Sequence, residues 1–203
     1  MEPIVETSEF LADEAATLAF AARFADSLQA PCSVALGGDL GAGKTTFVRG
    51  VLRALGVTGP IKSPTYALVE SYDTHKGEVH HLDAYRIESV DDFEARGGFE
   101  YFATPSIRFV EWPQRVQGVV SFDVELKFDF EGDGRRVRIA CSPLPGGEGL
   151  GVREAALLQS TAPNPQTLTP TLSPGEREPN RFASYDFDEV YPTPSPTATE
   201  SNR

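Results

Sequence analysis

Hydrophobic residues along most of the chain follow two alternating patterns, short apolar runs and apolar positions at helical spacing. Asp13–Leu28 has helical spacing and an acid near its start, so it predicts an amphipathic helix, and residues 47–55 show the same spacing. Short apolar runs with the length of buried strands lie at 32–36, 79–82 and 107–110. Strands that alternate with helices in this way indicate an α/β domain.

Two further pairs of segments predict antiparallel hairpins. Residues 67–72 and 78–83 flank a polar turn. Residues 123–130 alternate between polar and apolar, with Phe130 expected on the apolar face, and turn into 135–141. A short edge strand at 4–5 and a short capped helix that opens at Ser89 and stops at 97–98 complete the predicted elements.

The stretch Gly38–Thr45 fits the pattern G-x-x-x-x-G-K-[ST] and lies between a strand-like and a helix-like run, the context that a phosphate-binding loop requires. Gly41 and Gly43 let the backbone turn its N–H groups toward phosphate oxygens, and the next helix adds the partial positive charge of its N-terminus. Lys44 would reach the β- and γ-phosphates, and the Thr45 hydroxyl would bind Mg²⁺. These flanks favour a phosphate loop over the alternative, a plain glycine-rich turn.

Two acidic residues end apolar runs of the chain. Asp83 follows residues 79–82, and Glu111 follows residues 107–110. Because ligands of parallel-sheet nucleotide-binding folds lie at the carboxyl ends of strands, either acid could bind Mg²⁺ or its waters. A solvated carboxylate is the alternative for either acid alone, but two such acids beside a loop that needs a metal favour a functional role.

The polar segment Lys62–Tyr66 has two interpretations. Pro64 disfavours a helical conformation at Ser63, so the segment is a loop. It is either an ordinary turn or a switch segment whose Thr65 hydroxyl faces the γ-phosphate and the metal, and the sequence leaves both open.

Two further features of the sequence lie close to Asp83 and Glu111, the histidine pair at 80 and 81 and the tryptophan at 112. Adjacent side chains on a strand point to opposite faces, so His80 and His81 do not easily bind one ion, and we expect structural roles for them. Trp112, the only tryptophan, is either part of the core or a flank of the nucleotide site.

Composition adds a boundary and an expected location. The chain has 203 residues with 40% hydrophobic content, which suits one domain plus a tail. Ten of the 16 prolines lie at or after position 143, so we expect a domain at 1–141 and a Pro-rich, disordered extension at 142–203. No apolar run approaches the roughly 20 residues that span a bilayer, so we expect a cytoplasmic protein without membrane contact. The net charge of −12 argues against a broad nucleic-acid surface.

Four sequence blocks in order resemble the bacterial TsaE (YjeE) family, and together they are more specific than the phosphate loop alone. They are GDLGAGKTTFVRG at 38–50, SPTYALVE at 63–70, HLDAYR at 81–86 and VEWP at 110–113. The resemblance implies a P-loop NTPase-like three-layer α/β fold with a mixed, largely parallel central sheet. It also implies an ATPase needed to form the threonylcarbamoyl group at N6 of adenosine 37 in tRNAs that read codons beginning with A. TsaB and TsaD would be its partners, and tRNA would be contacted indirectly through them.

The resemblance also implies roles for individual residues. Lys44, Asp83, Glu111 and Thr65 would be catalytic, and Thr45, Glu111 and Asp83 would hold Mg²⁺. The ATP-binding residues would be Glu14, Asp39, Gly41, Ala42, Gly43, Lys44, Thr45, Thr46, Trp112 and Arg135. The sequence does not decide whether Asp83 or Glu111 orients the attacking water, and it leaves the oligomeric state open.

Three other functions are alternatives to this one. A small-molecule P-loop kinase would carry an Arg-rich lid and an acceptor pocket, and the sequence shows neither. A guanine-specific switch would carry N-K-x-D, which does not occur. A nucleotide-dependent assembly module with incidental hydrolysis would share the phosphate loop, so only experiment separates it from an ATPase. We expect slow turnover without partners, because no arginine is convincingly placed as an intramolecular finger.

Overall fold

A mixed seven-stranded sheet forms the centre of the computed structural model, which describes residues 5–64 and 67–141. The chain divides into two units, residues 1–163 and 164–203, and every described residue belongs to the first. The order across the sheet is β1-β7-β6-β2-β5-β4-β3. None of the helices in the described residues is long and apolar enough to cross a membrane.

The strands and helices alternate along the first half of the domain, as the hydrophobic pattern predicts. The strands are β1 Val5–Leu11, β2 Cys32–Gly38, β3 Val69–Thr74, β4 Gly77–Asp83, β5 Ile107–Glu111, β6 Val124–Glu131 and β7 Gly134–Cys141. The α-helices are α1 Glu14–Ser27, α2 Lys44–Ala54 and α3 Val90–Ala95, and the 3₁₀ helices are η1 Gly98–Phe102 and η2 Pro113–Val116.

The four central strands β6, β2, β5 and β4 run parallel, and antiparallel strands close the sheet on both sides. β3 pairs with β4 at one edge, and β7 joins β6 to the edge strand β1 at the other. The register sets Glu111 opposite Leu36 of β2 and opposite Asp83 of β4. The carboxyl ends of three central strands therefore meet beside the loop that follows β2.

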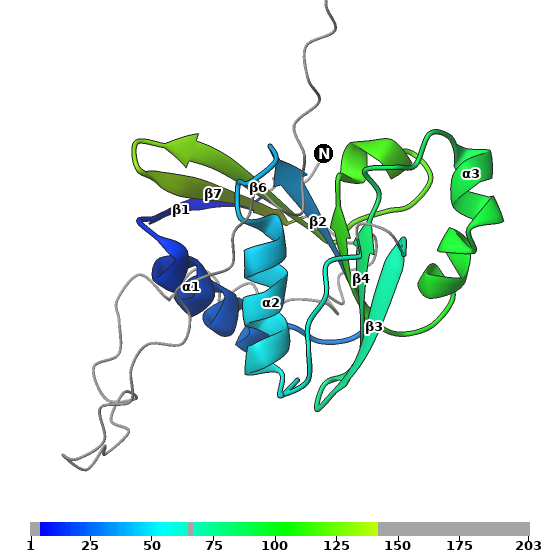
Figure 1. The fold of residues 1–203 in the computed structure, drawn as a ribbon, viewed down its shortest axis with the longest axis horizontal. Coiled ribbons are helices and arrows are strands. Elements are labelled where there is room, and N and C mark those ends of the chain that lie inside the picture. Colours follow the sequence, from blue (N-terminus) through cyan, green and yellow to red (C-terminus); the bar gives the residue numbers. More distant parts are fainter. Residues whose placement is uncertain (1–4, 65–66, 142–203) are drawn as a thin grey trace, which may run out of the picture. The chain divides into compact units, whose positions relative to one another are not determined.

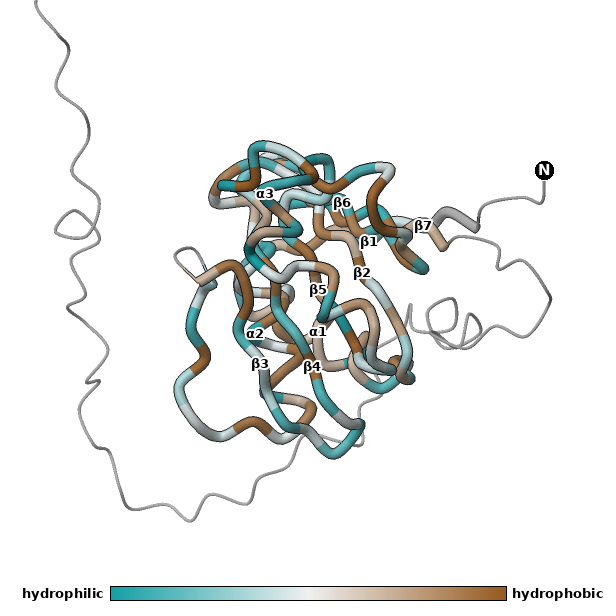
Figure 2. The backbone as a smooth tube through the Cα atoms, turned by 90° about the vertical axis from the view of Figure 1, so that its right-hand side faces the viewer, coloured by the Kyte–Doolittle hydropathy of each residue, from teal (hydrophilic) through white to brown (hydrophobic). Residues whose placement is uncertain are grey.

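Apolar side chains on both faces of the sheet make it the middle of three layers. On β5, Phe109 packs into the cluster formed with α1 and α2, whereas its neighbour Val110 packs into a second cluster with Phe93 of α3 and Val116 of η2. In Figure 1 α1 and α2 lie side by side, and α3 lies away from both. Figure 2 shows apolar stretches in brown along the central strands and hydrophilic ones in teal at turns such as that between β3 and β4.

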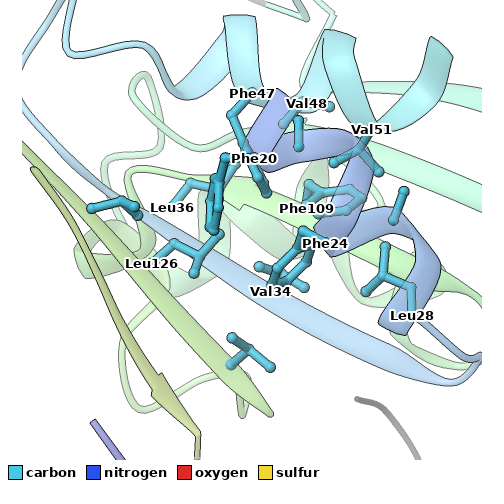
Figure 3. Close-up of a cluster of buried hydrophobic side chains, with 14 of the residues drawn as sticks. Phe20, Phe24, Leu28, Val34, Leu36, Phe47, Val48, Val51, Phe109 and Leu126 are labelled. Carbon is cyan, nitrogen blue, oxygen red and sulfur yellow. The ribbon is translucent and has the colours of Figure 1, made fainter. Parts of the chain in front are cut away.

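The larger cluster is rich in phenylalanine. Phe47 of α2 is fully buried, and its ring centroid lies 5.3–6.2 Å from those of four others, Phe20, Phe24, Phe109 and Phe128. Figure 3 shows the side chains of α1 and α2 directed at those of β2, β5 and β6. This packing fixes α2, and hence its N-terminal residue Lys44, against the end of β2.

The predicted fold class, an α/β domain with a mixed, largely parallel central sheet, is confirmed, with three local corrections. The edge strand extends to Leu11 because it pairs along its whole length with β7. Phe130 is 58% exposed, since it lies at the end of β6 next to the turn into β7, whereas Phe128 packs against Phe47 of α2. Neither 3₁₀ helix, η1 or η2, was predicted from the sequence.

Candidate active site

The loop between β2 and α2 adopts backbone angles that require glycine at both ends. Gly38 has φ 129°, and Gly43, the residue before α2, has φ 106°. A Cβ on Gly38 would lie 2.3 Å from the Phe128 carbonyl oxygen, so strand β6 also packs too closely for any side chain there. The loop is therefore held between β6 and the start of α2, whose N-terminus carries the partial positive charge that favours anions.

Lys44 places a buried ammonium group at the loop. Its Nζ donates to the carbonyl oxygens of Gly38 and Asp39, both at 2.8 Å, and lies 4.2 Å from the centroid of the Trp112 ring. Burial lowers the pKa of Lys44, while the carboxylates of Glu111, Asp83 and Asp39 act in the opposite direction. If an anion binds at the loop, the Lys44 ammonium group can donate to it instead of to the two carbonyl oxygens and so form stronger, charge-assisted hydrogen bonds.

A short hydrogen-bonded chain joins α2, β5 and β4. Thr45 Oγ1 donates to Glu111 Oε1 at 2.7 Å, and His81 Nε2 lies 2.9 Å from the same oxygen. Burial opposes ionisation of Glu111, but the bonds from His81 and Thr45 and the charge of Lys44 outweigh it, and the pKa of Glu111 is lowered. Glu111 is thus a buried carboxylate held by two donors.

Asp83 lies next to Glu111 in a different environment. The two residues are register partners on β4 and β5, and Asp83 Oδ1 accepts from the Tyr85 N–H at 3.0 Å. Burial raises the pKa of Asp83, and the Glu111 charge adds to that effect, while the Tyr85 bond opposes it. The environments of the two neighbouring acids therefore move their pKa values in opposite directions, a feature of sites that divide acid–base roles.

Trp112 flanks the loop and does not fill the core. It has φ 59°, in the left-handed region, and its backbone N–H donates to the Leu36 carbonyl oxygen at 3.3 Å. Its half-buried ring lies over Lys44 and 5.0 Å from the Tyr85 ring. Of the two alternatives for this tryptophan, the structure supports the position beside the candidate site.

Arg135 reaches the loop from β7, which lies beyond β6 on the side of β2 away from β5. Its Nη1 donates to the Ala42 carbonyl at 3.2 Å, and a Cβ on Gly43 would lie only 2.3 Å from that nitrogen. Its Nε is buried and has no hydrogen-bond partner among the described residues. β7 thus brings a guanidinium group into contact with the phosphate-loop backbone.

Not every residue predicted for the site joins this arrangement. Glu14 is exposed in the first turn of α1, and Thr46 is half-buried in the first turn of α2; within the described ranges neither side chain has a hydrogen bond or ion pair with the other candidates. Gly41, at φ 78°, is exposed on the loop. Thr65 lies outside the described residues.

The donor set fits a magnesium ion that is shared with phosphate. In the part of the chain that the structure describes, no group of three or more His, Cys, Asp or Glu side chains could hold a metal ion by itself. Thr45 and Glu111 instead bring a hydroxyl and a carboxylate oxygen together at 2.7 Å. Mg²⁺ favours such oxygen ligands, and it usually binds through one or two protein groups together with phosphates and water.

His81 is the residue that the sequence analysis missed. Its partner lies 30 positions away, so no local pattern points to the contact. The available signal was spacing, because His81 is two residues before Asp83 on the same strand and therefore shares its face. His80, on the opposite face, contacts Ser71 Oγ through Nδ1 at 2.8 Å, as expected for a structural histidine.

Comparisons with known proteins show relatives that match most of the described residues. The family model for TsaE, threonylcarbamoyl adenosine biosynthesis protein, matches residues 11–139. The tRNA threonylcarbamoyladenosine biosynthesis protein TsaE of Haemophilus influenzae is 37% identical over 138 residues, which cover 65% of this chain and 87% of that protein. The protein of the same description from Bacillus subtilis is 38% identical over 120 residues, covering 54% and 75%.

A solved structure shows the same fold. The crystal structure of YdiB from Bacillus subtilis superposes with a TM-score of 0.55 at 24% sequence identity, covering 70% of this chain and 90% of that one. The family match spans every strand and helix from the end of β1 into β7, including all the site residues described above. The resemblance seen in the sequence is confirmed, and the chain belongs to the TsaE family of threonylcarbamoyl adenosine biosynthesis proteins.

Proposed function

We propose that this protein is a magnesium-dependent ATPase that acts in the cytoplasm with TsaB and TsaD to form the threonylcarbamoyl group at N6 of adenosine 37 in tRNAs reading codons that begin with A. The observation that carries the proposal is the 2.7 Å bond between Thr45 and Glu111 beside Lys44, on a loop of the phosphate-binding pattern. Family membership supports the pathway, and the donor set supports the nucleotide and the metal.

Phosphate binding would use groups that the fold itself holds in place. Backbone N–H groups of the loop and of the first turn of α2 would donate hydrogen bonds to the phosphate oxygens. Lys44 Nζ, which now donates to the Gly38 and Asp39 carbonyls, would donate to the phosphates instead. Thr45 and Glu111 would hold Mg²⁺, which supplies charge neutralisation between the phosphates. Trp112 and Arg135 would flank the bound nucleotide, because each already contacts the loop or its lysine.

The different surroundings of the two acids favour a division of labour. Glu111 Oε1 is held by two donors, which suits a group that holds a metal in a fixed place. Asp83 is half-buried, and among the described residues it accepts one hydrogen bond, from the backbone N–H of Tyr85, so its carboxylate keeps lone pairs for a water molecule. We therefore assign the orientation of the attacking water to Asp83. The Thr65 hydroxyl remains a proposed contact of the γ-phosphate.

The first test is the removal of the Lys44 charge. Lys44→Ala should weaken MgATP binding by on the order of 100-fold, equivalent to about 2.7 kcal/mol, because the ammonium group is the cation nearest the loop carbonyls. Isothermal titration calorimetry measures this loss. Lys127→Ala is the matched control, since Lys127 is exposed on β6 and pairs only weakly with Asp129, 3.8 Å away. Equal affinities of Lys44→Ala and the wild type would reject the site.

Reconstitution tests the rest of the proposal. The protein, TsaB and TsaD are combined with unmodified tRNA, ATP and threonylcarbamoyl-AMP, and both released phosphate and modified adenosine are measured. Asp83→Asn should lose phosphate release and modification together. Modification that survives without hydrolysis would support an assembly module, and phosphate transferred to an added metabolite would support a kinase.

A further inference from the structure

We propose that His81 is a positioning residue that fixes the Glu111 carboxylate for metal binding; the inference rests on the proposed function. His81 is fully buried, and its Nε2 lies 2.9 Å from Glu111 Oε1. That oxygen also accepts the Thr45 hydroxyl. A single carboxylate oxygen is therefore held from β4 by the imidazole and from α2 by the threonine.

The hydrogen bond identifies which nitrogen of the imidazole donates. Glu111 accepts, so His81 Nε2 is the donor and carries the hydrogen. His81 Nδ1 is buried and has no hydrogen-bond partner within the described residues. Glu111 is thus the only polar partner that the structure gives to this side chain there.

The core alone gives no reason for a histidine at this position. A leucine would fill a similar space without burying an unpartnered nitrogen, which costs free energy. The neighbouring His80, on the other face of β4, has Ser71 as a hydrogen-bond partner and Glu78 3.6 Å from its Nε2. Because the other ring nitrogen of His81 has no partner among the described residues, its bond to Glu111 is the feature that explains a histidine here.

The His81 contact restricts the side-chain torsions of Glu111, which the backbone does not fix. β5 is paired on both sides at Glu111, with Leu36 and with Asp83, so the backbone position is fixed, but the side-chain torsions are not. If the Thr45 oxygen serves as a metal ligand, the His81 bond remains to orient the carboxylate. Hydrogen bonds that orient a ligand in this way commonly change metal affinity by about 10–100-fold.

The experiment compares three variants by metal binding, independently of turnover. Mn²⁺ is titrated by electron paramagnetic resonance in the presence of saturating ADP, and ADP affinity is measured separately in EDTA. His81→Leu should raise the Mn²⁺ dissociation constant about 10–100-fold, while ADP affinity without metal changes less than about twofold. His81→Gln, whose amide N–H₂ can replace the Nε2 donor, should recover binding to within about threefold of the wild type. His80→Leu removes a buried histidine from the opposite face and should leave Mn²⁺ binding unchanged.

The outcomes separate this inference from the proposed function. Wild-type protein that binds neither ADP nor Mn²⁺ would overturn both. Wild-type binding matched by His81→Leu would overturn only the positioning role. If His81→Leu does not fold, His81→Asn takes its place, because its shorter amide does not reach Glu111; equal Mn²⁺ affinity of the Asn and Gln variants would then reject the inference.

Discussion

Single glycines at the loop show how backbone angle and close packing act together. Gly38 and Gly41 both have positive φ values, 129° and 78°. A Cβ on Gly41 would meet nothing within 4 Å, whereas on Gly38 it would lie 2.3 Å from the Phe128 carbonyl oxygen. The two positions share an unfavourable angle for other residues, but only Gly38 is also closed by a neighbouring strand.

This difference predicts unequal costs of the same substitution. Gly41→Ala should lower the free energy of unfolding by about 1 kcal/mol, the strain of a left-handed residue. Gly38→Ala should lower it by about 3 kcal/mol or more, because β2 and β6 must also separate. Urea denaturation measures both, and Gly59→Ala, with open space around its Cβ, is the control. Equal costs at Gly38 and Gly41 would contradict the role given to β6.

At the scale of elements, the sequence was most informative where one face of a segment is apolar. The spacing of Phe47 and its neighbours was sufficient for α2, and the capping Ser89, whose Oγ accepts from the Asp92 N–H at 3.1 Å, was sufficient to locate the start of α3. The length of β1 and the exposure of Phe130 were not predictable, because both depend on how far a distant strand or helix extends. Local patterns determine the elements, and tertiary pairing determines their ends.

Helix α2 provides the prediction at this scale. Phe47→Ala removes the ring that contacts four other phenylalanines between α1, α2 and the sheet, so it should lower the free energy of unfolding by about 3–5 kcal/mol. Phe99→Ala is the matched control on the other face, because Phe99 is 38% exposed and should cost much less. Chemical denaturation of both variants gives the comparison. A small loss at Phe47 would show that α2 is anchored in another way.

At the scale of the molecule, the candidate site is assembled from segments that only the strand order brings together. The loop, Asp83 and Glu111 could be predicted as one site, because parallel strands share an edge. The spacing of His81 to Asp83 shows only that the two share a face of one strand, and the contact of His81 with Glu111 also requires β4 to lie directly beside β5. Arg135 came from the resemblance alone, and its contact with Ala42 depends on how β7 continues the sheet.

The same strand order predicts where the chain can be shortened. Cys141 is the last residue of β7, the family match ends at residue 139, and ten of the 16 prolines lie at or after position 143. A chain that ends at Cys141 should therefore keep the free energy of unfolding of the full chain, and MgATP at about 100 times its dissociation constant should stabilise both by about 2.7 kcal/mol. Thermal and urea denaturation with and without the nucleotide measure this.

A shorter truncation supplies the contrast. A chain that ends at Glu131 lacks β7, which pairs with both β6 and the edge strand β1. It also lacks Arg135 and the buried Val137 and Ile139. We expect it not to fold, because β1 loses its pairing partner and the core beneath α1 is opened. A loss of stability on ending at Cys141, or a stable fold on ending at Glu131, would contradict the domain boundary inferred from the change in composition.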